Sequence, residues 1–237
     1  MSRASLVRIA WTSLAIPLLA LAPGALATAR ASPDQGPVSL CVIRIGMDYW
    51  PAVRDLKPDR STFTPPFGGG VQPLGYGAQV AYMHGAGRML GARAYVGGEF
   101  AGDLNGSGRR YAGIDVASGQ TVQAEMFANV GYFAPCGRLV WRKRRLEWHV
   151  SGGAGLYLMR VKDNIQGVGF VDTDVHDATF GGYVGLGAGR MLRRGPMWLE
   201  LESRVHAFDF RHLRPGFPGQ RAGGPLLEVA AAIDWAL

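Results

Sequence analysis

The segment PLLEVAAAIDWAL, residues 225–237, alternates between apolar and more polar side chains over most of its length. Val229 and Ile233 share one face of an extended chain and Glu228 and Asp234 share the other, because successive side chains of a strand point to opposite faces. In a barrel that spans a bilayer, the apolar face meets lipid and the polar face lines the interior. The segment therefore predicts the closing strand of such a barrel.

Seven earlier segments show the same period of two. They lie at about 38–50, 75–86, 90–102, 121–134, 145–161, 178–191 and 197–210. Each is long enough for the roughly 9–11 residues of a tilted membrane-spanning strand. In the fourth segment, Met126 and Val130 are predicted to face lipid, and Gln123 and Glu125 the interior. The pattern as a whole predicts an all-β fold, an eight-stranded antiparallel up-and-down transmembrane β-barrel.

The connections between these segments alternate in length. The long ones are 51–74, 103–120, 162–177 and 211–224, and the short ones are 87–89, 135–144 and 192–196. Membrane barrels have short turns at the periplasmic rim and longer loops outside. We therefore expect short periplasmic turns, four longer extracellular loops and both chain ends at the short-turn rim.

The N-terminus has the pattern of a secretory signal. Arg3 and Arg8 precede an apolar stretch over 9–21, and Ala25 and Ala27 supply small residues for cleavage. The predicted division is a signal peptide over 1–27, with cleavage as late as 31 left open, a short segment over 28–37, and the barrel over 38–237. An uncleaved anchor helix is the alternative, which Pro17 disfavours.

Residues 181–189 read GGYVGLGAG, a strand in which glycine alternates with larger side chains. With the eight-strand pattern, this segment resembles the outer-membrane β-barrel superfamily, in particular the small eight-stranded OmpA, OmpX and OmpW-like barrels. The resemblance implies export to the outer membrane of a Gram-negative bacterium, contact with outer-membrane lipid and lipopolysaccharide, and insertion by the barrel assembly machinery. Members of the group usually end in Phe or Trp, whereas this chain ends in Leu237, with Trp235 two positions earlier.

The net charge of +7 comes largely from basic residues at predicted turns, such as 142–145 and 193–194. Aromatic residues that could stack on bases are not interleaved with them, so we expect no nucleic-acid partner. Lipid headgroups are the expected neighbours of these turns. The long loops would be free to bind an extracellular ligand, whose identity the sequence does not indicate.

The polar rows of the predicted strands would bring many ionisable side chains into the interior. They are Arg44, Asp48, Arg93, Glu99, Glu125, Glu147, Glu200, Glu202, Arg204, His206, Glu228 and Asp234. The interior of an eight-stranded barrel is just wide enough to be filled by side chains, and buried charges must be paired. We therefore expect a salt-bridged plug. A narrow acidic pore that favours cations is the alternative.

His149 and Ser151 lie two positions apart on one predicted face, a spacing that suits a base and a nucleophile. The pair resembles the His-x-Ser pair of eight-stranded lipid A deacylases, which implies His149 as base and Ser151 as nucleophile. The orienting carboxylate has no clear counterpart, and Asp163 is the nearest downstream acid. Because both side chains are predicted to face the interior, we expect polar filling residues and no catalytic residue.

Asp172, Asp174 and Asp177 gather in a predicted loop. Alternate acids in loops can hold a hard cation, but the glycine of the helical calcium loop is missing, so a solvated acidic loop without metal is expected. No GxSxG, HExxH, CxxC or Walker pattern is present, and we expect no cofactor. Cys41 on the first strand and Cys136 in a predicted turn would lie too far apart for a disulfide.

Besides the narrow pore or small-solute passage, three functions remain open at this point. The first is a non-enzymatic integral outer-membrane barrel with a structural or loop-mediated role. The second is an outer-membrane lipid A-modifying hydrolase that uses His149 and Ser151. The third is a soluble periplasmic barrel that binds an apolar ligand, which would require the apolar rows to face inward.

Overall fold

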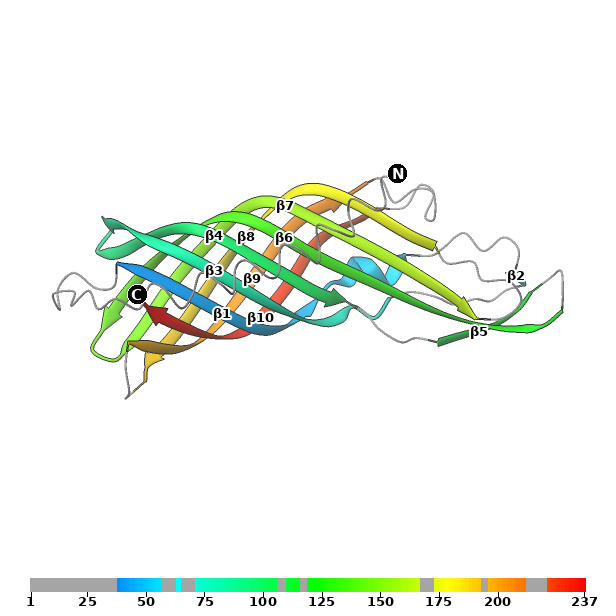
Figure 1. Cartoon of the computed structure of the whole chain (residues 1–237), viewed down its shortest axis with the longest axis horizontal. Helices are drawn as coiled ribbons and strands as arrows, with labels where there is room; N and C mark the ends of the chain where they lie inside the picture. The colour runs from blue at the N-terminus through cyan, green and yellow to red at the C-terminus, as the bar shows by residue number, and fades with distance from the viewer. Residues whose placement is uncertain are drawn as a thin grey trace. The chain divides into compact units, whose positions relative to one another are not determined.

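The computed structural model describes residues 38–56, 63–64, 71–105, 110–115, 119–166, 173–192, 196–211 and 221–237. The chain divides into two compact units, Met1–Val38 with Leu237, and Ser39–Ala236. The second unit contains the described strands (Figure 1). Among the described residues, no helix has the length and apolar character needed to cross a membrane.

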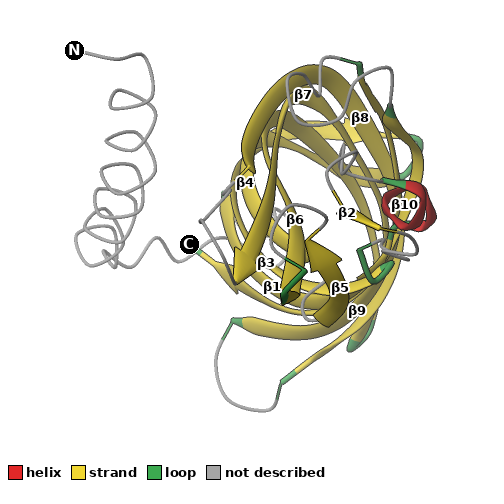
Figure 2. Ribbon diagram, turned by 90° about the vertical axis from the view of Figure 1, so that its right-hand side faces the viewer, coloured by secondary structure: helices red, strands yellow, loops and turns green. Residues whose placement is uncertain are grey.

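Eight long strands form a closed antiparallel ring. They are β1 (Ser39–Tyr49), β3 (Leu74–Met89), β4 (Ala92–Asn105), β6 (Thr121–Lys143), β7 (Leu146–Gln166), β8 (Thr173–Met191), β9 (Met197–Phe210) and β10 (Ala222–Ala236). Each strand pairs with its neighbour in the chain, and β10 pairs with β1 from Leu40↔Ala236 to Tyr49↔Leu227. Figure 2 looks into the ring from one side. The predicted eight-stranded up-and-down barrel is therefore confirmed.

Three shorter elements lie at the long-loop end. The 3-10 helix η1 (Pro51–Asp55) follows β1, and the short strand β2 (Phe63–Thr64) pairs with β5 (Arg110–Asp115), which in turn pairs with β6. Trp50, at the start of η1, is buried and packs edge-on against Phe208 with ring centroids 5.2 Å apart. An apolar layer thus fills the barrel interior next to the long loops.

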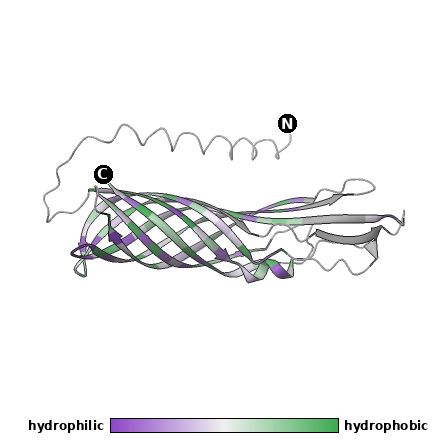
Figure 3. Cartoon of the chain, turned by 90° about the horizontal axis from the view of Figure 1, so that it is seen from below, coloured by the Kyte–Doolittle hydropathy of each residue, from purple (hydrophilic) through white to green (hydrophobic). Residues whose placement is uncertain are grey.

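The outward rows of the strands are apolar and exposed all round the ring. Ile45 on β1 is 68% exposed, Leu201 on β9 is 61% exposed and Phe180 on β8 is 83% exposed. Their in-strand neighbours Arg44 and Glu202 point inward and are buried. Figure 3 shows the resulting bands of hydropathy along the strands. Apolar side chains therefore cover the outside of the barrel, the reverse of what a soluble ligand-binding barrel would require.

The predicted fourth strand was wrong in extent and in facing. It was expected to end near residue 134, but β6 continues to Lys143, and only Arg144 and Arg145 form the turn to β7. Met126 and Val130, predicted to face lipid, are buried inside, whereas Phe133 is 60% exposed on the outside. The cause is that the part of β6 nearest the long loops lines the apolar layer of the interior, where inward side chains need not be polar.

The connections also differ from the predicted lengths. Residues 162–166 continue β7 and 173–177 belong to β8, so much of the predicted loop 162–177 is a long β-hairpin. Between β3 and β4, Leu90 and Gly91 both have positive φ angles, 53° and 74°. Two successive residues in that conformation form the tight hairpin turn that matches the twist of paired strands. The connection between β3 and β4 is therefore a tight two-residue turn.

Candidate functional site

Four buried charges from three strands form a closed ring of ion pairs in the middle of the barrel. Arg204 on β9 contacts Glu202 through Nε at 3.0 Å and contacts Glu99 on β4. Arg44 on β1 contacts the same two acids, Glu99 at 3.2 Å and Glu202 at 2.7 Å. Each arginine thus touches both glutamates. We call Arg44, Glu99, Glu202 and Arg204 the central cluster.

Neutral donors complete the hydrogen bonding of Glu99. The hydroxyl of Tyr183 donates to its Oε2 at 2.9 Å, and that of Tyr132 donates to its Oε1. The Arg204 guanidinium also lies over the Tyr183 ring, 4.3 Å from its centroid. Buried ion pairs offset their desolvation only when such additional bonds satisfy the remaining lone pairs. The central cluster meets that requirement at Glu99.

A second group lies nearer the short turns and centres on Arg138 of β6. Its guanidinium contacts Asp234 on β10 at 2.5 Å, Glu200 on β9 at 2.5 Å and Glu147 on β7 at 3.4 Å. It also lies 2.7 Å from Nδ1 of His149. All five side chains are buried. We call Arg138, Glu147, His149, Glu200 and Asp234 the turn-side cluster.

A third polar set lies on the long-loop side of the central cluster. His206 pairs through Nε2 with Glu228 at 3.0 Å, and its Nδ1 lies 3.0 Å from the hydroxyl of Tyr157. Gln79 on β3 donates to Glu228 and accepts from Arg204 at 3.0 Å, which joins this set to the central cluster. His149 of the turn-side cluster lies 3.5 Å from Glu202 of the central cluster, so the polar interior is one continuous network.

Glycines on β8 make room for these large side chains. A Cβ atom at Gly187 would lie 2.3 Å from the ring of His149, and one at Gly189 would lie 2.6 Å from Cγ of Glu200. Both distances are far below van der Waals contact, so a side chain at either position would displace a member of the turn-side cluster. The alternation of glycine in the sequence thus serves the packing of the interior.

Most of the predicted interior residues belong to the three sets, with some differences. Asp48 is buried on the inward face of β1, whereas Arg93 is only half-buried and lies over the Tyr95 ring at 5.8 Å. The side chain of Glu125 lies outside the described residues. Arg138 was missed because the sequence prediction placed it in a turn. The apolar odd-numbered residues Phe133, Leu139 and Trp141 would have indicated that residue 138, on the opposite face of β6, points inward.

The arrangement of His149 and Ser151 differs from a base and its nucleophile. The Ser151 hydroxyl donates to Glu202, and within the described part of the chain no hydrogen bond joins it to His149. Both side chains point into the packed interior, and they are only 2% and 5% exposed. A nucleophile must instead be bonded to its base and reachable by substrate. The side chain of Asp163 lies outside the described residues.

The predicted acidic loop is in part a strand. Asp174 and Asp177 lie on β8, on opposite faces, and Asp172 lies outside the described residues. Asp174 accepts two bonds from Arg160 on β7, at 2.9 and 2.6 Å, and the bonded guanidinium lowers the pKa of that carboxyl below its usual range. Asp177 accepts a bond from the backbone N–H of Ala178 at 2.8 Å. The two acids therefore do not converge on one cation.

Within the described parts of the chain, one other set has metal-ligand chemistry. Ligand atoms of Glu147, His149 and Glu200 lie within 4.8 Å of one another. NH2 of Arg138, however, lies within hydrogen-bonding distance of all three side chains. The guanidinium therefore takes the position that a cation would need.

The two cysteines are free thiols. Cys41 lies on β1, as expected, with its side chain on the outward face. Cys136 was predicted to lie in a turn, but it is buried on the inward face of β6. Facing opposite sides of the barrel wall, the two thiols cannot meet the geometry of a disulfide.

No protein-family model and no curated protein matches the sequence. Among solved structures, the chain is similar to Neisserial surface protein A, with 10% identity over 84% of this chain and 96% of the other, at a TM-score of 0.42. It is also similar to the N-terminal β-barrel domain of Pseudomonas aeruginosa OprF, with 10% identity over 85% and 100% of the two chains, at a TM-score of 0.35. A third is Ail, the attachment invasion locus protein of Yersinia pestis, in complex with the heparin analogue sucrose octasulfate, with 10% identity over 83% and 99%, at a TM-score of 0.39. The strand pairing of the chain itself identifies it as an eight-stranded antiparallel β-barrel with an ion-paired interior.

Proposed function

We propose that this chain is a non-enzymatic integral barrel of a Gram-negative outer membrane, with a closed interior and long loops that are free to bind an external partner. The observation that carries the proposal is the sorting of side chains across the barrel wall. Apolar residues such as Ile45, Leu201 and Phe180 are exposed outside, whereas carboxylates and guanidinium groups are buried inside. In water this distribution would expose a large apolar surface, and in lipid it is the expected one.

The interior supports a structural role over a pore. The Arg204–Glu99 contact joins β9 to β4, and the Arg138–Asp234 contact joins β6 to β10. In each case the two strands are separated by half of the ring. Two such contacts, at different levels along the barrel, cross the path that an ion would take. The apolar layer at Trp50 and Phe208 fills the interior beyond them.

The outward residues of β8 change from polar to apolar along the strand, and we call the apolar part the apolar belt. On β8 the outward row runs from Phe180 through Val184 to Leu186, and the outward residues before it, Asp174 and His176, are polar. The hairpin formed by the ends of β7 and β8 therefore projects beyond the belt on the long-loop side. A projecting β-hairpin on a rigid barrel suits the display of a binding surface.

The experiment that tests the proposal is membrane fractionation followed by electrophoresis in SDS with and without boiling. We expect the protein in the outer-membrane fraction, with faster migration before boiling because the closed barrel resists SDS. In planar bilayers, we expect no single-channel events. Recovery as a soluble periplasmic protein would refute the membrane assignment, and steady ion conductance would refute the closed interior.

A further inference from the structure

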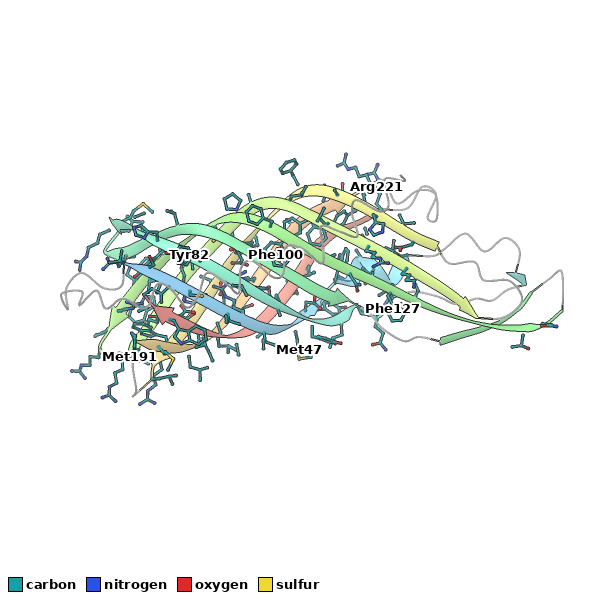
Figure 4. All side chains as sticks on the ribbon, in the orientation of Figure 1. Met47, Tyr82, Phe100, Phe127, Met191 and Arg221 are labelled. Carbon is teal, nitrogen blue, oxygen red and sulfur yellow. The ribbon has the colours of Figure 1, made fainter. Side chains whose placement is uncertain are left out.

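The short-turn end of the barrel carries exposed cations from two neighbouring turns. Lys143 ends β6, Arg144 and Arg145 form the turn to β7, and Arg190 precedes Met191, the last residue of β8. The two turns are adjacent, because the backbone N–H of Met191 donates to the carbonyl of Arg145 at 2.9 Å. In Figure 4, long side chains tipped with nitrogen project at the end of the barrel that carries Met191. We call Lys143, Arg144, Arg145 and Arg190 the basic rim.

The charges of the basic rim are not neutralised by nearby acids. Within the described residues, none of its four side chains forms an ion pair. The neighbouring acids Glu147, Glu200 and Asp234 are buried and hold Arg138 instead. Four positive side chains are thus presented together to the surroundings, and their combined positive potential favours a ligand with negative charge.

Cations at the opposite end of the barrel are arranged differently. Arg160 is paired with Asp174 at 2.6 Å, and Arg211 is paired with Asp209 at 2.6 Å. These two cations on the long-loop side therefore each have a carboxylate partner. The four cations of the basic rim have no such partner among the described residues.

The basic rim lies at the edge of the apolar belt. On β8, Arg190 follows Leu186 and Ala188 in the same outward row, and on β6, Lys143 follows Trp141. A cation one step beyond an apolar row lies where the acyl chains of a bilayer end and the headgroups begin. The phosphate groups of lipids lie at that depth, and guanidinium groups match their geometry with paired hydrogen bonds.

We propose that the basic rim binds the phosphate of an anionic glycerophospholipid in the leaflet at the short-turn end of the barrel. This inference rests on the proposed membrane location. Phosphatidylglycerol has the required chemistry, since its headgroup has a net negative charge and its acyl chains would lie against the outward rows of β6 and β8. A zwitterionic lipid offers a phosphate of similar shape but cancels its charge.

The test measures lipid selectivity at this end of the barrel. The full mature chain is refolded into phosphatidylcholine bilayers that contain brominated phosphatidylglycerol, and quenching of tryptophan fluorescence gives the relative association constant. Trp141 and Trp148 lie at this end of the barrel and are partly exposed on its outward face. Their fluorescence therefore reports on lipids beside the basic rim. We expect phosphatidylglycerol to be preferred over phosphatidylcholine by about fivefold, and less in high salt.

The variant K143Q/R145Q/R190Q should bring the preference close to one. The matched control R54Q/R211Q/R221Q removes three exposed cations away from the rim and should keep the preference of the unmodified chain. An equal loss in both variants, no preference in the unmodified chain, or stronger binding of brominated lipid A through the same side chains would each overturn the inference. Boiling-dependent migration is checked first on every sample. A sample that has inserted but shows no selectivity contradicts the rim site alone, whereas failure to insert contradicts the membrane barrel itself.

Discussion

Arg204 and Glu99 are 105 residues apart in the chain and lie on strands β9 and β4, which are separated by half of the ring, yet NH1 and NH2 of the arginine each donate to an oxygen of the carboxylate. The NH2 bond measures 3.1 Å. A bidentate pair fixes both distance and orientation. The contact therefore ties two opposite walls of the barrel to each other across its full width.

Removing one partner of this contact should destabilise the barrel strongly. Arg204→Met leaves Glu99 buried with less positive charge, and loss of one partner of a buried pair costs about 3–5 kcal/mol. Urea unfolding in lipid bilayers, followed by tryptophan fluorescence, measures the loss. The double variant R204M/E99L removes both charges and should regain a large part of it.

The control for this prediction is the exposed pair of Arg160 and Asp174. Exposed pairs contribute about 0–1 kcal/mol, so Arg160→Gln should shift the unfolding midpoint only slightly. If R204M and R160Q had the same effect, the cross-barrel contact would contribute no special stability.

Substitution of Gly187 should be costly although it adds only a methyl group. The new Cβ would lie 2.3 Å from the His149 ring, and overpacking of this kind costs about 1–3 kcal/mol. H149S in the G187A background vacates the space and should recover only part of the lost stability, because the contact between His149 and Arg138 is lost with it. Gly102→Ala, where a Cβ would have no neighbour within 4 Å, should be tolerated in the same unfolding assay.

A charge at Phe133 should disfavour the membrane-inserted state. The side chain is 60% exposed on the outside of β6, and an arginine on the lipid face costs about 0–1 kcal/mol near the interface and about 2–4 kcal/mol at the bilayer centre. We expect Phe133→Arg to lower the yield of heat-modifiable barrel and Phe133→Leu to leave it unchanged. Normal insertion of the arginine variant would argue that Phe133 does not face lipid.

The closed interior should open when both crossing arginines are removed. In R138A/R204A, the acids that these side chains hold, among them Glu99 and Asp234, gain space and water. We expect a small cation-selective conductance in planar bilayers, because the remaining groups are mainly carboxylates. The unmodified chain serves as the silent reference, and a double variant that folds without conducting would place the barrier elsewhere in the interior.

The alternation of side chains predicted the ring of strands and most inward faces, because a period of two is a local property. It failed on β6, where Met126 and Val130 line an apolar part of the interior and so resemble lipid-facing residues. Which charged side chains pair with each other inside the clusters could not be predicted from the sequence. Arg138 and Asp234 are brought together only by the shear and closure of the whole ring, and that information is not contained in any one segment.

Closure of the ring by β10 also has a consequence for the order of folding. Leu40 pairs with Ala236. The backbone groups on that edge of β1 therefore stay unpaired until β10, the last strand of the chain, is in place. Glu228 and Asp234, the partners of His206 and Arg138, arrive on that same final strand. Until then the interior charges can stay hydrated in an open, curved sheet, and their dehydration coincides with the last step. Such long-range pairing is slow to form, and a chain that lacks β10 would leave an open edge and an incomplete set of charges at once.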